Sequence, residues 1–387
     1  MKSIINKIIA LVFASAAILS CAEDNTSEII INVNGGGGSV VGGTESLSGN
    51  ISSDLTLDAT KEYTITGPMV IESGATLTIP AGMTIKAAAT GADVYLAIAQ
   101  GGKIMAEGTS TQPIVLTSAA QTPNAGDWGG LIILGKAPIN SVASGTATSE
   151  IGNLPYGGSD ANDNSGILRY VRVEYSGGKA SGQSENNGIS FYGVGNGTTV
   201  EYIQVFEGKD DGVEFFGGTV NVNYMSIVNA EDDSIDWTEG YSGSITNAYV
   251  KHGTTHDKGI EADGFNTDLG NNSSPVFWSN PSITNLTIVG LGSGSSSEAV
   301  RLRAGTRVFM ENVNISGYAE GFDLDDAETG NGVTSQLTFV DKVKFDDVTT
   351  KMKNDTGASF TIADFLLEDA NATGTDYATW GAGWTRQ

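Results

Sequence analysis

Several residue types are scarce in this chain of 387 residues. Its single cysteine, Cys21, excludes an intrachain disulfide, so the fold has to be held together by other means. Only 8 prolines stand against 52 glycines, which suits many tight turns joined by strands whose hydrogen-bond ladders are not interrupted. Basic residues are also few, 20 against 45 acidic ones. This excess of negative charge argues against a nucleic-acid partner, and it favours cations or hydroxylated partners.

Long apolar runs are missing too, with one exception near the beginning. Residues 8–19 form an apolar run after two lysines, and this run is shorter than the roughly 20 residues that a membrane-spanning helix needs. The pattern predicts a signal peptide over residues 1–20. It ends in ILSC at 18–21, which resembles a bacterial lipobox. The resemblance implies cleavage before Cys21 and attachment of lipid, such as palmitate, to its sulfur; an ordinary secretory signal is the alternative.

Residues 21–48 are predicted to be the lipidated cysteine and a flexible tether. The glycines at 35–38 and 42–43 favour flexibility over packing. The sequence AEDN at 22–25 resembles the export signal that brings lipoproteins of Bacteroidota to the cell surface. We therefore expect an outer-membrane protein that is held to the membrane by the lipid on Cys21 and is exposed at the cell surface.

A five-residue phrase recurs through the second half of the chain. It begins with a polar and a small residue and continues with an apolar, a polar and another apolar residue, which is the alternation typical of a β-strand. The copies are NGISF (187–191), DGVEF (211–215), DSIDW (233–237), KGIEA (258–262), EAVRL (298–302) and EGFDL (320–324). They begin 24, 22, 25, 40 and 22 residues apart. A nearly fixed period of this size predicts a solenoid of stacked coils.

A second column of strands precedes the phrases, and most of these strands open with an asparagine. They cover residues 201–205, 223–227, 247–250, 285–289 and 312–315. Asparagine tolerates a left-handed backbone, so we expect these asparagines to lie in turns and to stack along the solenoid axis. Parallel strands joined by crossovers wind in a right-handed sense.

The sequence therefore predicts an all-β fold, a right-handed parallel β-helix that forms a single elongated domain over residues 49–387. The early strands are expected at about 94–98, 103–105, 114–117 and 131–134. They should form an N-terminal cap that covers the open edge of the β-helix. WGAGWT at 380–385 is expected to be the closing segment. The only fair helix candidate lies near 360–367.

Longer motifs resemble a family of right-handed β-helix lipoproteins that is common in Bacteroidota. They are GTSTQPIVLTSA (108–119), GDWGGLIILGKAPIN (126–140), YGG (156–158), LRYVRVEYSGG (168–178), DDGVEFFGGTVN (210–221), DDSIDWTEG (232–240) and WGAGWT (380–385). The resemblance covers about residues 100–387. It implies a fold and a surface location, and it implies no established activity.

The fourth residue of each phrase is expected to point outward in one column. That column reads Ser190, Glu214, Asp236, Glu261, Arg301 and Asp323. Carboxylates about 5 Å apart repel one another, so either a cation lies among them or their pKa values rise. Hard carboxylate oxygens suit Ca²⁺, which takes 6–8 oxygen ligands. The candidate calcium ligands are Asp210, Asp211, Asp232, Asp233, Asp236, Asp257, Glu261 and Asp263; a solvated acidic face with structural turn aspartates is the alternative.

Two long excursions from the coils are predicted, at about 263–281 and 141–165. The first carries Phe277 and Trp278 beside the acidic column, and loops on a rigid scaffold often hold binding residues. An aromatic ring beside carboxylates suits a sugar, whereas a Trp packed under its own loop is the structural alternative. The candidate ligand-binding residues are Glu214, Asp236, Glu261, Phe277, Trp278, Arg301 and Arg303. The leading hypothesis is non-catalytic, calcium-dependent binding of an extracellular glycan or other polymer.

Two other functions stay open at this point. A polysaccharide lyase or glycoside hydrolase could use the same face, with Glu214, Asp236 and Arg301 as its catalytic residues. A structural or adhesion role in the cell envelope is the third hypothesis. His252 and His256 are four residues apart, which on a helix would suggest zinc. Because they fall in a Gly/Thr turn, we expect two exposed turn residues.

Overall fold

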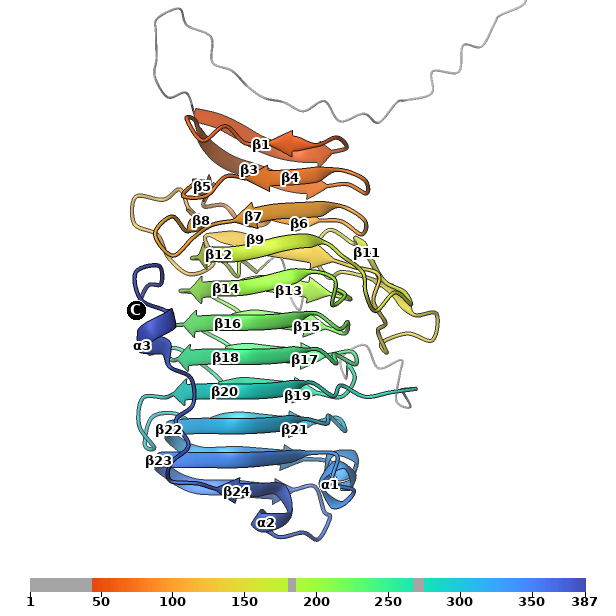
Figure 1. Ribbon diagram of the computed structural model, residues 1–387, viewed down its shortest axis with the longest axis vertical. Helices are drawn as coiled ribbons and strands as arrows, with labels where there is room; N and C mark the ends of the chain where they lie inside the picture. The colour runs from red at the N-terminus through yellow and green to blue at the C-terminus, as the bar shows by residue number, and fades with distance from the viewer. Residues whose placement is uncertain (1–43, 180–185, 267–274) are drawn as a thin grey trace, which may run out of the picture.

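The computed structural model describes residues 44–179, 186–266 and 275–387, and they form an elongated stack of coils (Figure 1). Twenty-two strands join in one sheet. Their pairings are parallel throughout, and the sheet is wound into a right-handed parallel β-helix. The predicted fold class is confirmed.

The first third of the stack consists of coils like the rest. Its strands are β1 (Thr44–Ile51), β2 (Leu55–Thr56), β3 (Glu62–Ile71), β4 (Thr76–Ile79), β5 (Thr84–Ala87), β6 (Gly91–Ile98), β7 (Lys103–Glu107), β8 (Ile114–Ser118) and β9 (Trp128–Leu134). Residues 44–48, which the sequence assigns to the tether, belong to β1 and pair with β3. The physical reason is their alternation, which turns Leu47 and Ile51 into the core.

The repeated phrases form a column of short strands, which we call the short-strand column. It comprises β13 (Ile189–Tyr192), β15 (Val213–Phe216), β17 (Ile235–Thr238), β19 (Ile260–Asp263) and β21 (Glu298–Arg303), followed by the second half of β22 (Phe309–Asp325). The longer strands between them are β12 (Gly166–Glu174), β14 (Thr199–Phe206), β16 (Asn221–Val228), β18 (Ser244–Lys251) and β20 (Ser282–Val289). Ser190, Glu214, Asp236, Glu261, Arg301 and Asp323 lie opposite one another in that order, as predicted.

An asparagine ladder runs along the bend in the long strands. Asn247, Asn285 and Asn312 have φ of 59°, a left-handed conformation that asparagine tolerates. Each side chain donates to the one in the preceding coil, with N···O distances of 3.0 Å from Asn285 to Asn247 and 2.7 Å from Asn312 to Asn285. Asn247 donates to Asn223 at 3.1 Å. Asn223 differs from the prediction, because the left-handed residue of its coil is the following Tyr224.

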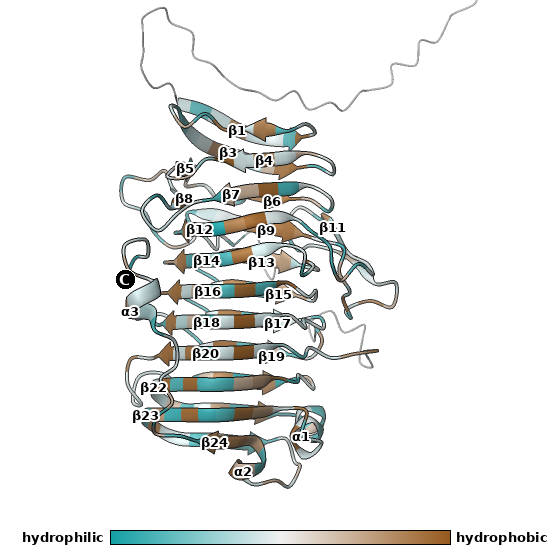
Figure 2. Cartoon of the chain, in the orientation of Figure 1, coloured by the Kyte–Doolittle hydropathy of each residue, from teal (hydrophilic) through white to brown (hydrophobic). Residues whose placement is uncertain are grey.

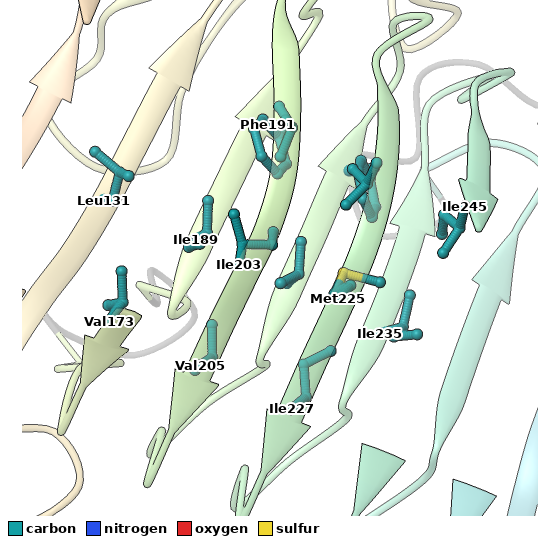
Figure 3. Packing of buried hydrophobic residues seen from close by; sticks show 14 of the residues in the cluster. Leu131, Val173, Ile189, Phe191, Ile203, Val205, Met225, Ile227, Ile235 and Ile245 are labelled. Atoms are coloured by element: carbon teal, nitrogen blue, oxygen red, sulfur yellow. The ribbon is translucent and has the colours of Figure 1, made fainter. Parts of the chain in front are cut away.

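The core is one continuous apolar cluster that extends from Leu47 to Leu366. Figure 2 shows apolar positions recurring in successive strands, and Figure 3 shows them stacking as layers. Phe215 is stacked on Phe191 at 5.3 Å and on Tyr241 at 4.3 Å between ring centroids. A single unbroken core supports the prediction of one elongated domain.

A second, smaller apolar cluster lies outside the coils. It is covered by the excursion at 141–165, in which β10 (Thr146–Thr148) and β11 (Pro155–Gly157) form an antiparallel hairpin. Tyr156 of this hairpin packs on Tyr192, with ring centroids 4.9 Å apart. The hairpin therefore covers the outer face of the short-strand column at β13, and the same cluster includes Phe216 of β15.

The C-terminal region completes the last coils and then turns back. It contains α1 (Ala327–Thr334), β23 (Phe339–Asp355), α2 (Ile362–Phe365), β24 (Leu366–Glu368) and α3 (Tyr377–Trp380). The expected helix near 360–367 is the four-residue α2, while α1 is not anticipated by the sequence. Asp326 caps α1 by accepting hydrogen bonds from the N–H groups of residues 328 and 329.

Residues 369–387, which we call the C-terminal strap, run back along one flank of the stack (Figure 1). Thr375 N donates to Thr287 Oγ1 at 3.0 Å, and Tyr377 is stacked on Tyr249 at 3.8 Å. Further on, the amide side chain of Gln204 forms two hydrogen bonds with the backbone of Arg386, at 2.7 and 2.9 Å. The segment 380–385 therefore packs against a flank of the β-helix and does not cover one of its ends.

Candidate functional site

An acidic cavity of about 390 Å³ opens on the outer side of the short-strand column. All eight candidate calcium ligands line it, and so do Glu214 and Arg303. Six further lining residues were not singled out as site residues by the sequence: Glu150, Asn187, Phe216, Thr238, Lys258 and Asn266. Ten carboxylates therefore meet two cationic side chains in one small volume.

The stacking of short strands produces the central part of this cavity. Glu214, Asp236 and Glu261 are outward residues of β15, β17 and β19 and lie in register. Neighbouring strands are about 4.8 Å apart, so their carboxylates cannot avoid one another. Oxygens of Asp211, Glu214 and Asp236 all lie within 4.8 Å of each other, and the same holds for Asp233, Asp236 and Glu261. Asp236 belongs to both groups.

The turn aspartates have a structural role beside this one. Asp211 Oδ1 accepts the backbone N–H of Asp233 at 3.0 Å, and Asp233 Oδ1 accepts the backbone N–H of Lys258 at 2.6 Å. Such contacts are expected if the aspartates have a structural role in turns of a solvated acidic face, which is the alternative to a calcium site. Each carboxylate still has a second oxygen, and both residues line the cavity.

Lys258 is the cation that the site prediction misses. Its Nζ lies 2.6 Å from Asp257 Oδ2, 2.9 Å from Glu261 Oε1 and 3.6 Å from Asp233 Oδ2, and its side chain is only 9% exposed. Burial lowers the pKa of Lys258, but the neighbouring carboxylates outweigh burial and hold the pKa above its ordinary value. The sequence does contain a signal for Lys258. It is the first residue of the phrase KGIEA, and the two preceding phrases, DGVEF and DSIDW, begin with aspartate.

Arg303 is the second cation at the cavity. It pairs with Asp263 at 2.5 Å and with Glu261 at 2.6 Å. Burial lowers the pKa of Arg303, and Asp263 and Glu261 more than offset this, so the pKa is raised.

Arg301 does not join Glu214 and Asp236, which corrects its assignment to the same site. Its guanidinium group forms two 2.7 Å hydrogen bonds with Glu298 and one of 3.2 Å with Asp323. Glu298 starts the same strand and presents both oxygens to the planar guanidinium, a geometry that holds arginine firmly. Arg301 therefore neutralises charge within the column; it lies on the same strand as Arg303 but does not line the acidic cavity.

Thr238 is an unusual lining residue because its hydroxyl group has no protein partner. It follows Asp236 by two residues and is 6% exposed, and no hydrogen bond reaches its Oγ1 from the part of the chain that the structure describes. Buried hydroxyl groups are nearly always hydrogen-bonded to protein, water or ligand. The hydroxyl group of Thr238 therefore has to be satisfied by water or by a bound species in this cavity.

Burial raises the pKa values of Asp211, Glu214 and Asp236 well above their ordinary range. Neighbouring carboxylates add to this effect, with Asp236 acting on Asp211 and Glu214 acting on Asp236. Such shifts mark either protonated acids or a place where a cation is bound.

A family model for a pectate-lyase-like β-helix domain matches residues 49–385. The chain belongs to this family. No curated protein matches the sequence significantly. A pectate-lyase-like β-helix domain fits a carbohydrate-related function, and which function this is has to be argued from the site.

The pectate-lyase-like domain is expected to respond to pH through these acids. Because folding raises their pKa values, the free energy of unfolding without metal should increase as pH falls through the raised values toward about 4. His252 acts in the opposite direction below about pH 6.5, so the effect is best measured as a difference between two proteins. In chelator at pH 8, Asp236→Asn should be more stable than wild type by about 1–3 kcal/mol, because one like charge is removed.

The advantage of Asp236→Asn should shrink as pH is lowered from 8 to 5, as measured by urea unfolding at each pH. An advantage that grows on acidification would contradict the proposed charge repulsion. The variant Glu107→Gln serves as control, since Glu107 lies on β7 and does not line the acidic cavity.

The histidine pair differs from its prediction. His252 is 2% exposed, and its ring is stacked on that of His256 with centroids 4.1 Å apart and planes within 6°. It is buried because it continues the alternation of β18, where Val250 is buried and Lys251 partly exposed. Burial, with His256 adding to it, lowers the pKa of His252 to about 3. Two parallel rings cannot share a metal ion, since each nitrogen lone pair lies in its own ring plane.

The two aromatic residues of the long excursion are not beside the carboxylates. Neither Phe277 nor Trp278 lines the acidic cavity. Phe277 lies against Gly240, where an added Cβ would meet its ring at 2.3 Å, and its carbonyl accepts a 2.7 Å hydrogen bond from Asn140. Arg307 lies over the Trp278 ring at 4.6 Å. These contacts agree with the structural alternative, in which the aromatic residue packs under its own loop and does not bind a sugar. Residues 267–274 of the excursion lie outside the described part.

Glu239 connects both excursions at the edge of the cavity, and the sequence did not single it out. Tyr156 Oη donates to its carboxylate at 2.7 Å, and Asn266 Nδ2 does so at 3.2 Å. Burial raises the pKa of Glu239. Since Tyr156 and Asn266 come from different excursions, this carboxylate links the two excursions, and of these three residues Asn266 lines the cavity.

Proposed function

We propose that this pectate-lyase-like β-helix domain binds an extracellular glycan, or another hydroxylated polymer, through its acidic cavity with the help of Ca²⁺. The observation that carries the proposal is the enclosure of ten carboxylates with two cationic side chains. Such an excess of like charge is costly unless cations are bound.

The residues that would hold Ca²⁺ are Asp211, Glu214 and Asp236, with their oxygens within 4.8 Å of one another. Ca²⁺ takes 6–8 oxygen ligands, more than these three side chains supply. Its remaining positions would be filled by water or by hydroxyl and carboxylate groups of a glycan. The orphaned hydroxyl of Thr238 supports a bound species at this end of the cavity.

Binding is favoured over lyase chemistry by the state of the two cations. A base that abstracts a proton has to be neutral, whereas Lys258 and Arg303 are kept protonated by their ion pairs. Inverting hydrolysis needs carboxyl groups about 6.5–9.5 Å apart, and the pair Glu214 and Asp236, whose oxygens lie within 4.8 Å of each other, is too close to carry it out. Retaining hydrolysis, at about 5–5.5 Å, is the second candidate that this pair supports.

We propose in addition that the protein is a lipoprotein of the outer membrane with its β-helix at the cell surface. The support is the apolar run at 8–19 after two lysines and the sequence ILSC at 18–21, which resembles a lipobox; both lie outside the described residues. Within the described residues no helix is long and apolar enough to cross a membrane. Labelled palmitate should be incorporated into the wild type and not into Cys21→Ala, and protease added to intact cells should digest the protein.

The glycan proposal is tested with the chain lacking residues 1–21 and a panel of soluble polysaccharides. Retardation in affinity gels should require Ca²⁺, and it should be lost in chelator and in Asp236→Asn but kept in Glu107→Gln. Release of reducing ends that depends on Glu214 and Asp236 would replace binding by hydrolysis. Neither binding nor turnover on any polysaccharide would favour a structural or adhesion role.

A further inference from the structure

The first residues of the first four repeated phrases form a column of their own that lines the acidic cavity. Going along the stack it reads Asn187, Asp211, Asp233 and Lys258. The hydrogen bonds from Asp233 N to Asp211 Oδ1 and from Lys258 N to Asp233 Oδ1 hold three of these residues in line. A lysine therefore occupies the place that carries a carboxylate in the two preceding coils.

The ammonium group of Lys258 lies where a metal ion would otherwise be expected. Oxygens of Asp233, Asp236 and Glu261 form a group within 4.8 Å, and Nζ is 2.9 Å from Glu261 and 3.6 Å from Asp233. Asp257 adds a third carboxylate contact at 2.6 Å. Nζ thus has three acidic neighbours, and the ammonium group contributes the positive charge that this end of the cavity needs.

The other end of the cavity has a cation only at its edge, where Lys179 Nζ lies 3.6 Å from Asp210 Oδ1. Asp211, Glu214 and Asp236 form no ion pair with any lysine or arginine in the described ranges. Asn187 donates to Glu214 at 2.6 Å and leaves the charge of its carboxylate uncompensated. The buried and unpartnered hydroxyl of Thr238 lies at the next outward position after Asp236, and it independently indicates a ligand here.

We propose that Lys258 is a built-in substitute for a second metal ion and limits the acidic cavity to one bound Ca²⁺, held by Asp211, Glu214 and Asp236. The inference rests on the calcium binding proposed above and adds its stoichiometry and its location. The two groups of oxygens share Asp236; the one at Lys258 is compensated by the chain, and the one with Asp211 and Glu214 by an ion from solution. Two further groups of lining carboxylates each include an acid that is paired with a lysine: Asp210, Asp211 and Asp232, through Lys179, and Asp232, Asp233 and Asp257, through Lys258.

Removal of the ammonium group should open the second position. Lys258→Met keeps most of the aliphatic stem, which can still pack, while Asp233 and Asp257 lose their internal cation and Glu261 keeps only its pair with Arg303. Four carboxylates, counting Asp236, then become available at that end, and carboxylate oxygens are ligands that Ca²⁺ accepts.

The test is isothermal titration calorimetry with CaCl₂ on the chain lacking residues 1–21, after dialysis against chelator and then buffer. Wild type should bind one Ca²⁺ per chain, and Lys258→Met should bind two. Lys258→Gln is measured in parallel, so that failure of one variant to fold does not end the test. Lys209→Met is the matched control, because Lys209 pairs with Glu231 at 3.6 Å outside the cavity; it should bind one.

The results separate two claims, that the cavity binds Ca²⁺ and that Lys258 limits it to one ion. A wild type that binds one Ca²⁺ while both Lys258 variants also bind one would overturn the role of Lys258 and leave calcium binding in place. A wild type that binds two would overturn it as well. A wild type that binds none at millimolar Ca²⁺ would overturn calcium binding itself, and the role of Lys258 with it. Loss of the first ion in Asp236→Asn locates the site, whereas its retention would refute the assigned ligands.

Discussion

Asp236→Asn should abolish most of the stabilisation that Ca²⁺ gives to the folded protein. A ligand present at about 100 times its dissociation constant adds about 2.7 kcal/mol to the free energy of unfolding. Asp236 belongs to both oxygen groups at the centre of the acidic cavity, so its replacement by asparagine removes one negative charge and one carboxylate oxygen from both groups. The measurement is urea unfolding with Ca²⁺ and with chelator, for wild type and variant.

The control for this prediction is Glu107→Gln, which should keep the full response to Ca²⁺. Without Ca²⁺ the order of stability reverses, since Asp236→Asn is then expected to be the more stable protein. Equal stabilisation of wild type and Asp236→Asn by Ca²⁺ would show that the ion binds elsewhere. A wild-type stability that Ca²⁺ does not change would remove the metal from the proposed function.

Trp237→Ala should cost about 3–5 kcal/mol of stability, the range for deleting a large buried aromatic side chain. Trp237 is fully buried, and its Nε1 donates to Thr306 Oγ1 at 2.9 Å. It lies between Phe215 and Ala262 of the neighbouring coils. The small Ala262 leaves room for the indole, and neither coil can close the gap that alanine would leave.

This second prediction is checked by urea unfolding with Trp237→Phe and Phe309→Ala as comparisons. Trp237→Phe should cost less than Trp237→Ala, because the ring still fills most of the space, although Thr306 loses its partner. Phe309 is 46% exposed, so Phe309→Ala should change stability by about 0.5 kcal/mol or less. Similar losses for Trp237→Ala and Phe309→Ala would contradict the packing argument.

The repeated phrase was sufficient to predict the fold because the regular coils of a parallel β-helix require a regular repeat in the sequence. One coil takes a nearly constant number of residues, so outward residues such as Glu214, Asp236 and Glu261 recur at a readable spacing and fall into register. The same argument placed the eight candidate calcium ligands in one cavity. These predictions depend on backbone periodicity alone.

The parts that the sequence predicted poorly depend on side-chain choices between neighbours. Arg301 has acids on several sides, and only the position of Glu298 decides which of them it binds. Trp278 could have faced the cavity, but Arg307 lies over its ring. Glu239 becomes a connecting residue only because Tyr156 and Asn266 reach it from loops that lie far apart in the sequence. Such contacts have no period and therefore leave no repeated pattern.

The C-terminal strap has a consequence for how the β-helix folds and unfolds. In a solenoid each coil contacts its neighbours, so an end can fray one coil at a time. The strap joins residues far apart in the sequence, since Arg386 binds Gln204 and Thr375 binds Thr287. Residue 386 follows all the coils along the chain, so the flank at Gln204 stays uncovered until residue 386 has been made. Completion of the strap would then turn a series of locally stable coils into one cooperative unit that loses its structure as a whole.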